Sequence, residues 1–394
     1  MKIGFKKITF KISQVQKKKV LIFIDWYLPG YKAGGPIQSV ANLVAHLKDE
    51  FEFSIITRDT DYCETIPYPS VKSDEWNTLP NGVKVFYISQ NNLSRTTIKN
   101  LIRKSDFDVV YLNGIYSIYF TLIPMLFLRK KHDKRVVIAA RGMLSEGSLN
   151  VKKTKKQFFI RATKVLNLFD KVVFHATTES EKKDIRKHFG NTIQIQLAGN
   201  LSQKLDNNSF FRREKVVGKL NLISVARISP EKNLLFALEI LKNVKSKVEF
   251  DIYGPVYNQI YWDECNKVIN TLPANVIVNY KGTAESDSVM SLLRNAHALF
   301  MPSTGENFGH IILQSFLAAC PVIISDATPW KFLSEKRVGW DIPLDQKQQF
   351  VNAIDAAAGL SQEAFNELSS NAFDFANNYV NNPDIISQNR SLFI

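Results

Sequence analysis

The chain has 394 residues, of which 45% are hydrophobic, and a formal net charge of +14 at pH 7. This composition excludes a disordered protein, and the length suits two domains better than one hydrophobic core. No apolar run approaches the ~20 residues that cross a bilayer, and the three cysteines are too scattered for a disulfide framework or a metal cluster.

The amino terminus is strongly basic, with seven lysines and no acidic residue in positions 1–19. Because lysines recur throughout it, this segment lacks the apolar core of a secretory signal. We interpret it as a basic extension and expect a cytoplasmic protein.

Charge differs between the two halves of the chain. Residues 1–200 contain 33 Lys and Arg against 17 Asp and Glu, whereas residues 201–394 contain 18 against 20. A basic half suits an anionic partner, either nucleic acid, lipid headgroups or a pyrophosphate-linked substrate, or it serves solubility alone. Nucleic acid ranks below lipid because no nucleic-acid-binding motif accompanies the charge.

Apolar runs alternate with helical periodicity in the first half, which is typical of α/β units on a parallel sheet. A glycine-containing loop and a helix follow the first predicted strand, and residues 115–128 are predicted to form a buried helix. The strands are predicted at residues 20–25, 53–57, 83–88, 109–112, 135–139 and 171–176.

A polar stretch interrupts this pattern and predicts a linker at residues 201–219. A second alternating series follows, so we predict two Rossmann-like domains at residues 20–200 and 220–372. Its strands are predicted at 220–226, 248–253, 276–280, 297–302 and 321–325, with helices at 233–244 and 309–319.

The most informative segment runs from Met301 to Asp326 as strand, glycine-containing loop, helix and strand. The loop ends where a helix begins, and the free backbone N–H groups and dipole of a helix start favour phosphate. Glu306 lies in this loop, at the carboxyl end of a parallel strand where α/β sheets bind ligands. Its carboxylate can accept hydrogen bonds from sugar hydroxyls, and Gln314 can reach a ribose from the helix.

This segment resembles the signature of retaining glycosyltransferase family 4, in which two glutamates flank a Phe-Gly pair. Glu306, Phe308 and Gly309 match the signature, whereas Gln314 replaces the second glutamate. A neutral amide loses the charge-assisted hydrogen bonds that a carboxylate makes to ribose hydroxyls. The substitution therefore leaves weaker donor binding, or inactivity, as open outcomes.

Two further loops resemble the same family. Arg227 and Lys232 bracket a turn after the first strand of the second half, and the resemblance implies that they bind the donor pyrophosphate. Gly34 and Gly35 precede Pro36 at the start of the first helix. The resemblance implies that this glycine loop faces the donor phosphates and the acceptor.

The first half also departs from the family. Relatives often carry His-x-His-Gly where this chain has Tyr111 and Asn113, so a catalytic histidine is absent, although Asn113 can still hydrogen-bond a sugar hydroxyl. The segment 139–144 resembles a family loop that places Arg141 either against a phosphate or acceptor or in an interior ion pair. The segment 175–181 resembles the stretch that ends the last strand of the first domain.

Three lesser features have two interpretations each. Trp330 either walls the donor pocket or packs in the core, and His310 either contacts phosphate or faces solvent. The lysines of segment 152–156 lie next to the apolar segment 158–160. They belong to a helix that either meets an anionic membrane or is simply solvated.

We therefore predict a GT-B fold, with two Rossmann-like domains whose parallel sheets face each other across a cleft. The resemblance implies that helices of residues 373–394 cross back to the first domain, and that the enzyme retains anomeric configuration without a cofactor or metal. Catalytic roles fall to Arg227, Lys232 and Glu306. Donor contacts fall to Gly34, Gly35, Asn307, Phe308, Gly309, His310 and Gln314, with Asn113 and Arg141 near the sugar or acceptor.

The predicted activity is transfer of a hexose from a nucleotide diphosphate sugar to a saccharide or lipid-linked acceptor. The family setting points to cell-surface polysaccharide or O-antigen synthesis in the cytoplasm, with peripheral association at the inner face of the membrane and no nucleic-acid partner. Two alternatives remain at this point. One is a catalytically silent homologue that binds sugar nucleotides, and the other is a basic membrane or nucleic-acid adaptor.

Overall fold

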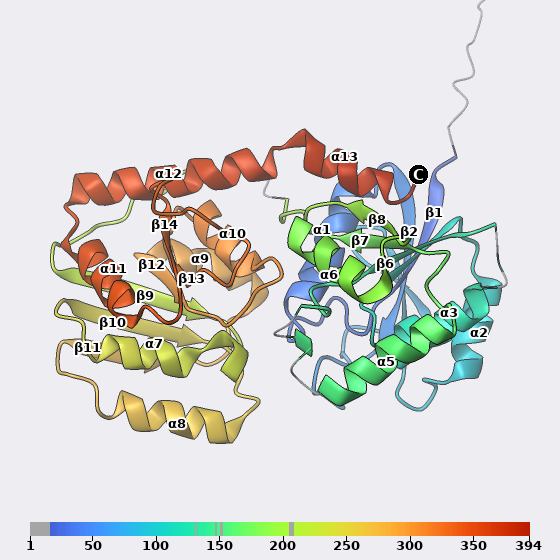
Figure 1. Cartoon of the computed structure of the whole chain (residues 1–394), viewed down its shortest axis with the longest axis horizontal. Helices are drawn as coiled ribbons and strands as arrows, with labels where there is room; N and C mark the ends of the chain where they lie inside the picture. Colours follow the sequence, from blue (N-terminus) through green and yellow to red (C-terminus); the bar gives the residue numbers. More distant parts are fainter. Residues whose placement is uncertain (1–15, 130, 132, 146–147, 150–152, 205–208) are drawn as a thin grey trace, which may run out of the picture.

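The computed structural model describes residues 16–129, 131, 133–145, 148–149, 153–204 and 209–394. They form two α/β units side by side, joined along one edge by the last two helices (Figure 1). The predicted basic extension lies largely outside the described residues. Its last lysines, Lys18 and Lys19, begin the first strand.

The first unit is built on an eight-stranded sheet in the order β3-β4-β2-β1-β5-β6-β7-β8. Its strands pair in parallel except for β3, which is antiparallel to β4 at the edge. The strands are β1 (Lys18–Phe23), β2 (Phe51–Arg58), β3 (Trp76–Thr78), β4 (Lys84–Ile88), β5 (Val109–Asn113), β6 (Arg135–Ala139), β7 (Val173–Ala176) and β8 (Gln194–Leu197).

The second unit has a six-stranded, wholly parallel sheet in the order β11-β10-β9-β12-β13-β14. The predicted linker lies between the two sheets apart from Lys219, which begins β9, and residues 205–208 are not described. The strands are β9 (Lys219–Val225), β10 (Lys247–Tyr253), β11 (Val276–Tyr280), β12 (Ala298–Met301), β13 (Val322–Ser325) and β14 (Gly339–Ile342).

Helices cover both faces of each sheet, which is why central strands such as β5 and β12 are apolar at successive positions. In β1, Val20 and Ile22 pack toward α1 (Gly35–Leu47), while Leu21 and Phe23 pack on the opposite face. That face is covered by α2 (Arg95–Lys104), η1 (Ile118–Leu122), α3 (Ile123–Leu128), α5 (Lys153–Val165) and α6 (Glu179–Phe189).

The second sheet is covered in the same way. Leu222 of β9 packs toward one group of helices and Ile223 toward the other. The first group is α7 (Leu234–Leu241), α8 (Gln259–Ile269) and α11 (Lys347–Gly359). The second is α9 (Val289–Asn295), α10 (His310–Leu317) and α12 (Gln362–Val380).

The predicted buried helix at residues 115–128 begins three residues later, as η1, a π-helical turn, followed directly by α3, and Ile118 and Leu126 on it are exposed. Among the helices of the described residues, none combines the length and hydropathy needed to cross a membrane.

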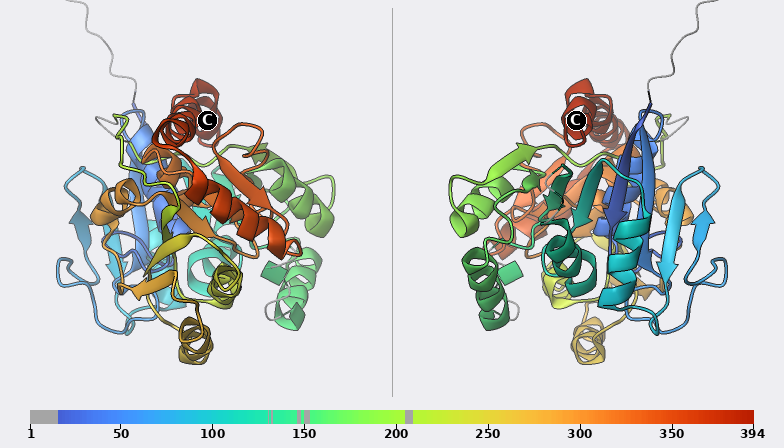
Figure 2. Two further views of the ribbon diagram at one scale, coloured as in Figure 1. Left: turned by 90° about the vertical axis from the view of Figure 1, so that its left-hand side faces the viewer. Right: turned by 90° about the vertical axis from the view of Figure 1, so that its right-hand side faces the viewer.

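The last helix, α13 (Pro383–Ser391), lies against the first domain rather than the second. Phe393 packs on Phe51 and Phe53 of β2, with ring centroids 5.4 and 5.7 Å apart. The Arg390 guanidinium pairs with the Glu50 carboxylate. The end views show α12 and α13 along one edge of the molecule (Figure 2). The chain thus returns to the first domain, so the two units are joined twice.

Candidate active site

A cleft of about 330 Å³ lies where the loops at the carboxyl ends of the strands of the two sheets meet. This is the edge at which open α/β sheets bind ligands. Asn113 is not part of the cleft wall. The predicted site residues that do line it are Gly34, Gly35, Arg141, Arg227, Lys232, Glu306, Asn307, Phe308, Gly309, His310 and Gln314.

Two cations project from the loop that follows β9. Lys232 closes a short 3₁₀ turn, Pro230–Lys232, and Asn233 then adopts a left-handed conformation with φ of 59° to start α7. Lys232 Nζ lies 2.5 Å from Glu306 Oε1, and the two side chains are only 20% and 11% exposed. Arg227 makes a longer ion pair of 3.5 Å with Glu231. The predicted cation–carboxylate constellation is therefore assembled in one place.

The loop that carries Glu306 is tied to the cation loop. Thr304 N–H donates to the Glu231 carbonyl, and Glu306 N–H donates to the Ala327 carbonyl. Gly309 ends this loop with φ of 76°, and no side chain caps the helix α10 that begins after it. The uncapped helix start faces the cleft, which suits it to an anionic group.

Trp330 packs in the core behind this loop, which decides between its two interpretations. Its indole Nε1 donates to the Phe308 carbonyl at 2.6 Å, and the residue is 6% exposed. Phe308 and Tyr379 lie against the Trp330 ring, with centroids 5.4 Å away in each case. The tryptophan thus supports the loop from behind, without lining the cleft.

The glycine loop of the first domain meets the second domain at His310. Gly34 has φ of 70° and caps α1, and Pro36 occupies its first turn. Ser39, one turn into α1, lies 2.8 Å from His310 Nε2. Burial and the nearby Arg141 cation lower the pKa of His310 to about 3, so this bridging imidazole is neutral. His310 is half-buried and contacts the first domain, contrary to the solvent-facing interpretation.

Arg141 lies in a network of neutral hydrogen-bond acceptors, and no carboxylate of the described residues pairs with its guanidinium. Its guanidinium donates from Nε to Asn113 Oδ1 at 2.8 Å, from Nη1 to Asn200 Oδ1 at 2.6 Å and from Nη2 to the Tyr111 hydroxyl at 2.8 Å. Asn113 is only 5% exposed. The Asn113 side chain therefore holds Arg141 in place. The sequence had instead suggested that Asn113 could hydrogen-bond a sugar hydroxyl.

The network continues to His175. The Tyr111 hydroxyl lies 2.9 Å from His175 Nδ1, and His175 Nε2 lies 2.8 Å from the Ala198 carbonyl. Burial and the Arg141 cation lower the pKa of His175 to about 3. A neutral ring then donates from Nε2 and accepts at Nδ1. The Tyr111 hydroxyl therefore donates to His175 and is free to accept from Arg141.

Glu181 is a site residue that sequence reasoning did not single out. It is 3% exposed, and its carboxylate accepts hydrogen bonds from the Gly142 and Thr177 N–H groups at 2.5 and 2.7 Å. Thr177 in turn accepts from Asn307 Nδ2 at 3.2 Å. The sequence does contain a pattern that could have identified Glu181, because Thr178 and Glu181 have the spacing of a capping box at the start of α6. Glu181 thus connects two first-domain loops with the second domain.

Within the described residues, no group of three or more His, Cys, Asp or Glu side chains is arranged to hold a metal ion. The charged residues that line the cleft are instead four cations, Lys32 and Arg141 of the first domain and Arg227 and Lys232 of the second, together with the carboxylate of Glu306. Such a site is suited to a ligand that carries phosphate at one end and hydroxyl groups at the other.

Comparison with known proteins gives concordant results. Residues 206–373 match the family model described as "Glycosyl transferases group 1". A 41.2 kDa uncharacterized protein in the cps region of Klebsiella pneumoniae is 23% identical over 310 residues, covering 74% of this chain and 82% of the relative.

Solved structures with the same fold cover nearly all of the chain. HepE of Anabaena, in complex with UDP and glucose, superposes with a TM-score of 0.69 at 14% identity, covering 95% of this chain and 98% of HepE. Sucrose-phosphate synthase of Thermosynechococcus elongatus superposes with a TM-score of 0.73 at 14% identity, covering 96% of this chain and 98% of the synthase. These matches confirm the predicted GT-B fold.

Proposed function

The second domain of this chain belongs to the glycosyl transferases of group 1, within a GT-B fold, and on that premise we propose that the protein transfers a hexose from a nucleotide diphosphate sugar. The acceptor is a saccharide or a lipid-linked acceptor, and the anomeric configuration is retained. Cell-surface polysaccharide synthesis is the proposed setting, in keeping with the relative from a cps region.

The ion pair between Lys232 and Glu306 carries this proposal. Lys232 and Arg227, which we call the diphosphate clamp, lie beside the uncapped start of α10 in one cleft. A bound diphosphate would draw Lys232 away from Glu306, because it offers more negative charge. The released Glu306 carboxylate would then accept hydrogen bonds from the sugar hydroxyls. Breaking this one ion pair would thus free Lys232 to bind the diphosphate and Glu306 to bind the sugar.

The clamp would also act on the reaction itself. As the bond between the anomeric carbon and the diphosphate oxygen breaks, negative charge accumulates on the leaving group. Two cations and the helix start are already in place to stabilise that charge. In this scheme the two cations and the helix start provide the positive charge that other enzymes obtain from a divalent cation. We therefore propose that no metal is required. Contact of the two domains around the cleft would keep water from the sugar, where it would cause hydrolysis.

Donor identity is the first quantity to measure. A thermal-shift screen with UDP, GDP, ADP and their sugars should give stabilisation by one base above the others, followed by transfer or hydrolysis of that donor. UDP-glucose is the first candidate, because HepE was solved in complex with it. If no nucleotide diphosphate stabilises the protein and duplex or single-stranded DNA binds at physiological salt, the proposal is wrong.

A catalytically silent homologue is the second candidate, and three residues favour it. Gln314 replaces a glutamate of the family 4 signature that the segment resembles, and Tyr111 and Asn113 stand where members of that family often carry histidines. Such a protein would bind the donor without turnover. Counting both hydrolysis and transfer as activity separates it from an enzyme.

Replacing Gln314 with glutamate is expected to preserve donor affinity or to raise it by up to about tenfold. A carboxylate at this wall of the cleft would form charge-assisted bonds to ribose hydroxyls, worth about 1.5–3 kcal/mol against about 1 for an amide. Isothermal titration calorimetry with UDP measures the effect. Gln38→Glu is the matched control, because it adds the same charge to the opposite wall. Weaker binding by Gln314→Glu alone would argue against a ribose contact.

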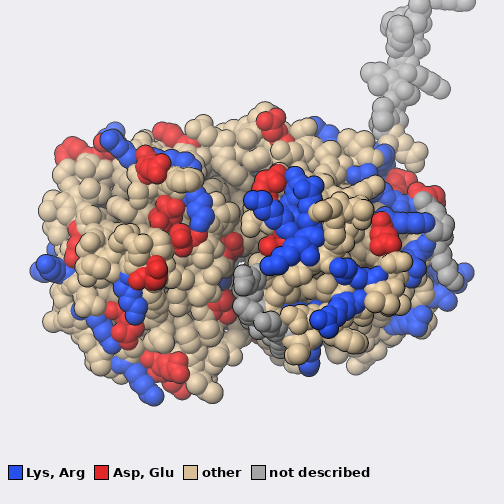
Figure 3. Space-filling model, in the orientation of Figure 1, with Lys and Arg blue, Asp and Glu red and all other residues tan. Residues whose placement is uncertain are grey.

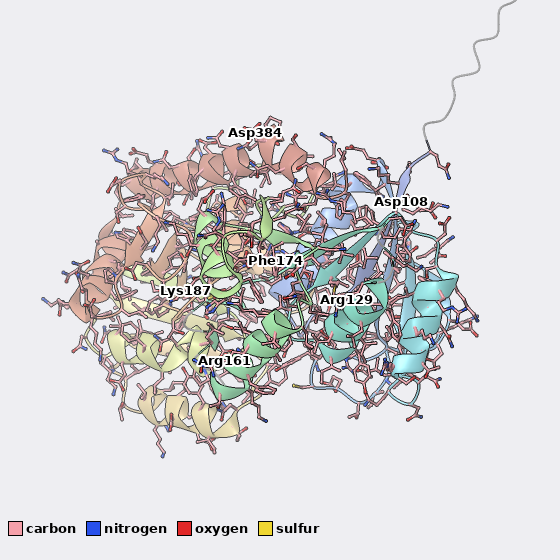
Figure 4. All side chains as sticks on the ribbon, turned by 45° about the vertical axis from the view of Figure 1, so that its right-hand side comes forward. Asp108, Arg129, Arg161, Phe174, Lys187 and Asp384 are labelled. Carbon is pink, nitrogen blue, oxygen red and sulfur yellow. The ribbon has the colours of Figure 1, made fainter. Side chains whose placement is uncertain are left out.

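We also propose that the first domain docks on an anionic membrane through α5. Phe158 and Val165 are 75% and 83% exposed, and Arg161 lies on the same helical face between them. Lysine and arginine gather on this side of the first domain, whereas the second domain carries both signs of charge (Figure 3). Arg161 on α5 and Lys187 on the neighbouring α6 both belong to this side (Figure 4).

The variant Phe158→Ser with Arg161→Glu is expected to bind vesicles that contain phosphatidylglycerol at least fivefold more weakly. The reason is that each basic side chain near an anionic surface contributes about 1 kcal/mol. Vesicle co-sedimentation measures the change. Phe332→Ser with Arg337→Glu makes the same replacements on exposed residues of the second domain and should have no effect. Equal losses for both pairs would exclude α5 as the docking face.

A further inference from the structure

An aromatic side chain of the first domain contacts one of the two clamp cations. Tyr62 lies in the loop after β2, and the Arg227 guanidinium carbon lies 5.9 Å from the centroid of its ring. Tyr257 of the second domain packs edge-on against the same ring at 5.7 Å. Tyr62 is therefore a point of contact between the domains that involves a proposed donor-binding residue.

The first domain holds Tyr62 firmly from two sides. Trp26 packs against it at 5.0 Å with the ring planes nearly perpendicular. Asp61, which is 7% exposed, accepts hydrogen bonds from the Tyr62 N–H at 2.7 Å and from the Tyr31 N–H at 2.9 Å. The same carboxylate also accepts from the Lys32 N–H. Tyr62 is thus fixed to the segment that leads into the glycine loop.

Arg227 is held more loosely within its own domain. Among the described residues, its ion-pair partner is Glu231, at 3.5 Å, and the two side chains are 33% and 52% exposed. Exposed pairs of this kind restrain a side chain weakly. A cation over an aromatic face adds an attraction that keeps the guanidinium near the ring. The ring of Tyr62 is consequently the second restraint on where Arg227 points.

We propose that Tyr62 is a positioning residue for Arg227, so that the diphosphate clamp is complete only when the two domains meet. This inference rests on the proposed function, because it presumes that Arg227 binds the donor diphosphate. Lys232 is oriented by Glu306 within the second domain, whereas Arg227 has only a weak partner there and takes part of its orientation from the first domain. When the cleft closes, Tyr62 therefore places Arg227 for binding, and the affinity for the second phosphate of the donor rises.

The test compares Tyr62→Leu with Tyr62→Phe, using UDP and UMP as ligands in isothermal titration calorimetry. Tyr62→Leu is expected to weaken UDP binding about 3- to 30-fold and to leave UMP binding within twofold. Tyr62→Phe keeps the aromatic face and should bind both as the unchanged protein does. Trp76→Leu, an exposed aromatic residue at the far edge of the first sheet, should alter neither affinity.

A double-mutant cycle with Arg227→Ala completes the experiment. If Tyr62 acts through Arg227, Tyr62→Leu has no further effect on UDP binding once Arg227 is replaced. Equal losses for UDP and UMP, or losses that add in the double variant, would overturn the inference and leave the proposed function intact. If the unchanged protein bound neither nucleotide and the screen found no other, the proposed function would fail and this inference with it.

Discussion

Replacing Lys232 with alanine is expected to lower kcat/KM for sugar transfer at least 100-fold while the protein remains folded. Removing one group that stabilises charge in a transition state typically costs about 10²- to 10³-fold. Here the loss has a second source, because Glu306 is 11% exposed and its ion-pair partner is Lys232. Without that partner, the carboxylate repels the incoming diphosphate.

The two sources of the loss can be separated with Glu306. Glu306→Gln removes the repulsion but also weakens the contacts proposed for the sugar. Adding it to Lys232→Ala should therefore restore part of the UDP affinity and none of the transfer rate. Glu306→Ala alone is expected to lower transfer by a similar factor to Lys232→Ala.

Lys242→Ala provides the control, because Lys242 pairs with Glu239 on α7 away from the cleft. Transfer is measured with labelled donor, and thermal unfolding verifies that each variant is folded. Full activity of Lys232→Ala in a folded protein would contradict the assignment of the clamp.

Much of the fold could be predicted because central strands such as β5, β12 and β13 are short apolar runs buried on both faces. β6 and β11 have the predicted bounds, 135–139 and 276–280, and the other predicted strands differ by a few residues at their ends. The strands that the sequence did not reveal lie at sheet edges. β8 reads Gln-Ile-Gln-Leu, β14 reads Gly-Trp-Asp-Ile and β3 is three residues long. Pairing with a neighbouring strand, rather than local composition, determines these segments.

The second-domain part of the site was predictable for a related reason. Lys232 and Glu306 each lie in a loop directly after a parallel strand, and β9 and β12 are neighbours in the sheet. Any pattern that identifies both strands also predicts that their loops adjoin.

The first-domain network was not predictable. Asn113, Arg141 and His175 lie on or after three adjacent strands, β5, β6 and β7. Whether their side chains face the cleft or one another depends on packing that motifs do not encode. Contacts between the domains depend still more on the final arrangement, since Ser39 and His310 are 271 residues apart.

Replacing Gly142 with alanine is expected to abolish most transfer by preventing the domains from meeting. Gly142 has φ of 70°, and a Cβ added to it would lie 2.8 Å from Asn307 Cβ of the second domain. Both atoms belong to short, restrained groups, so the contact can be relieved only by separating the loops. We expect at least a tenfold loss of kcat/KM, together with a larger radius of gyration in solution scattering.

Gly82→Ala separates this contact from backbone strain. Gly82 has φ of 84°, and a Cβ there would meet no atom within 4 Å. Both substitutions therefore cost about 1 kcal/mol of folding free energy, because alanine is strained in the left-handed conformation. Only Gly142→Ala also forces the domains apart. Asn307→Gly added to Gly142→Ala removes the opposing Cβ and should restore compactness, even where it weakens donor binding. If Gly142→Ala proved as active and as compact as Gly82→Ala, the close approach of these loops would have no part in catalysis.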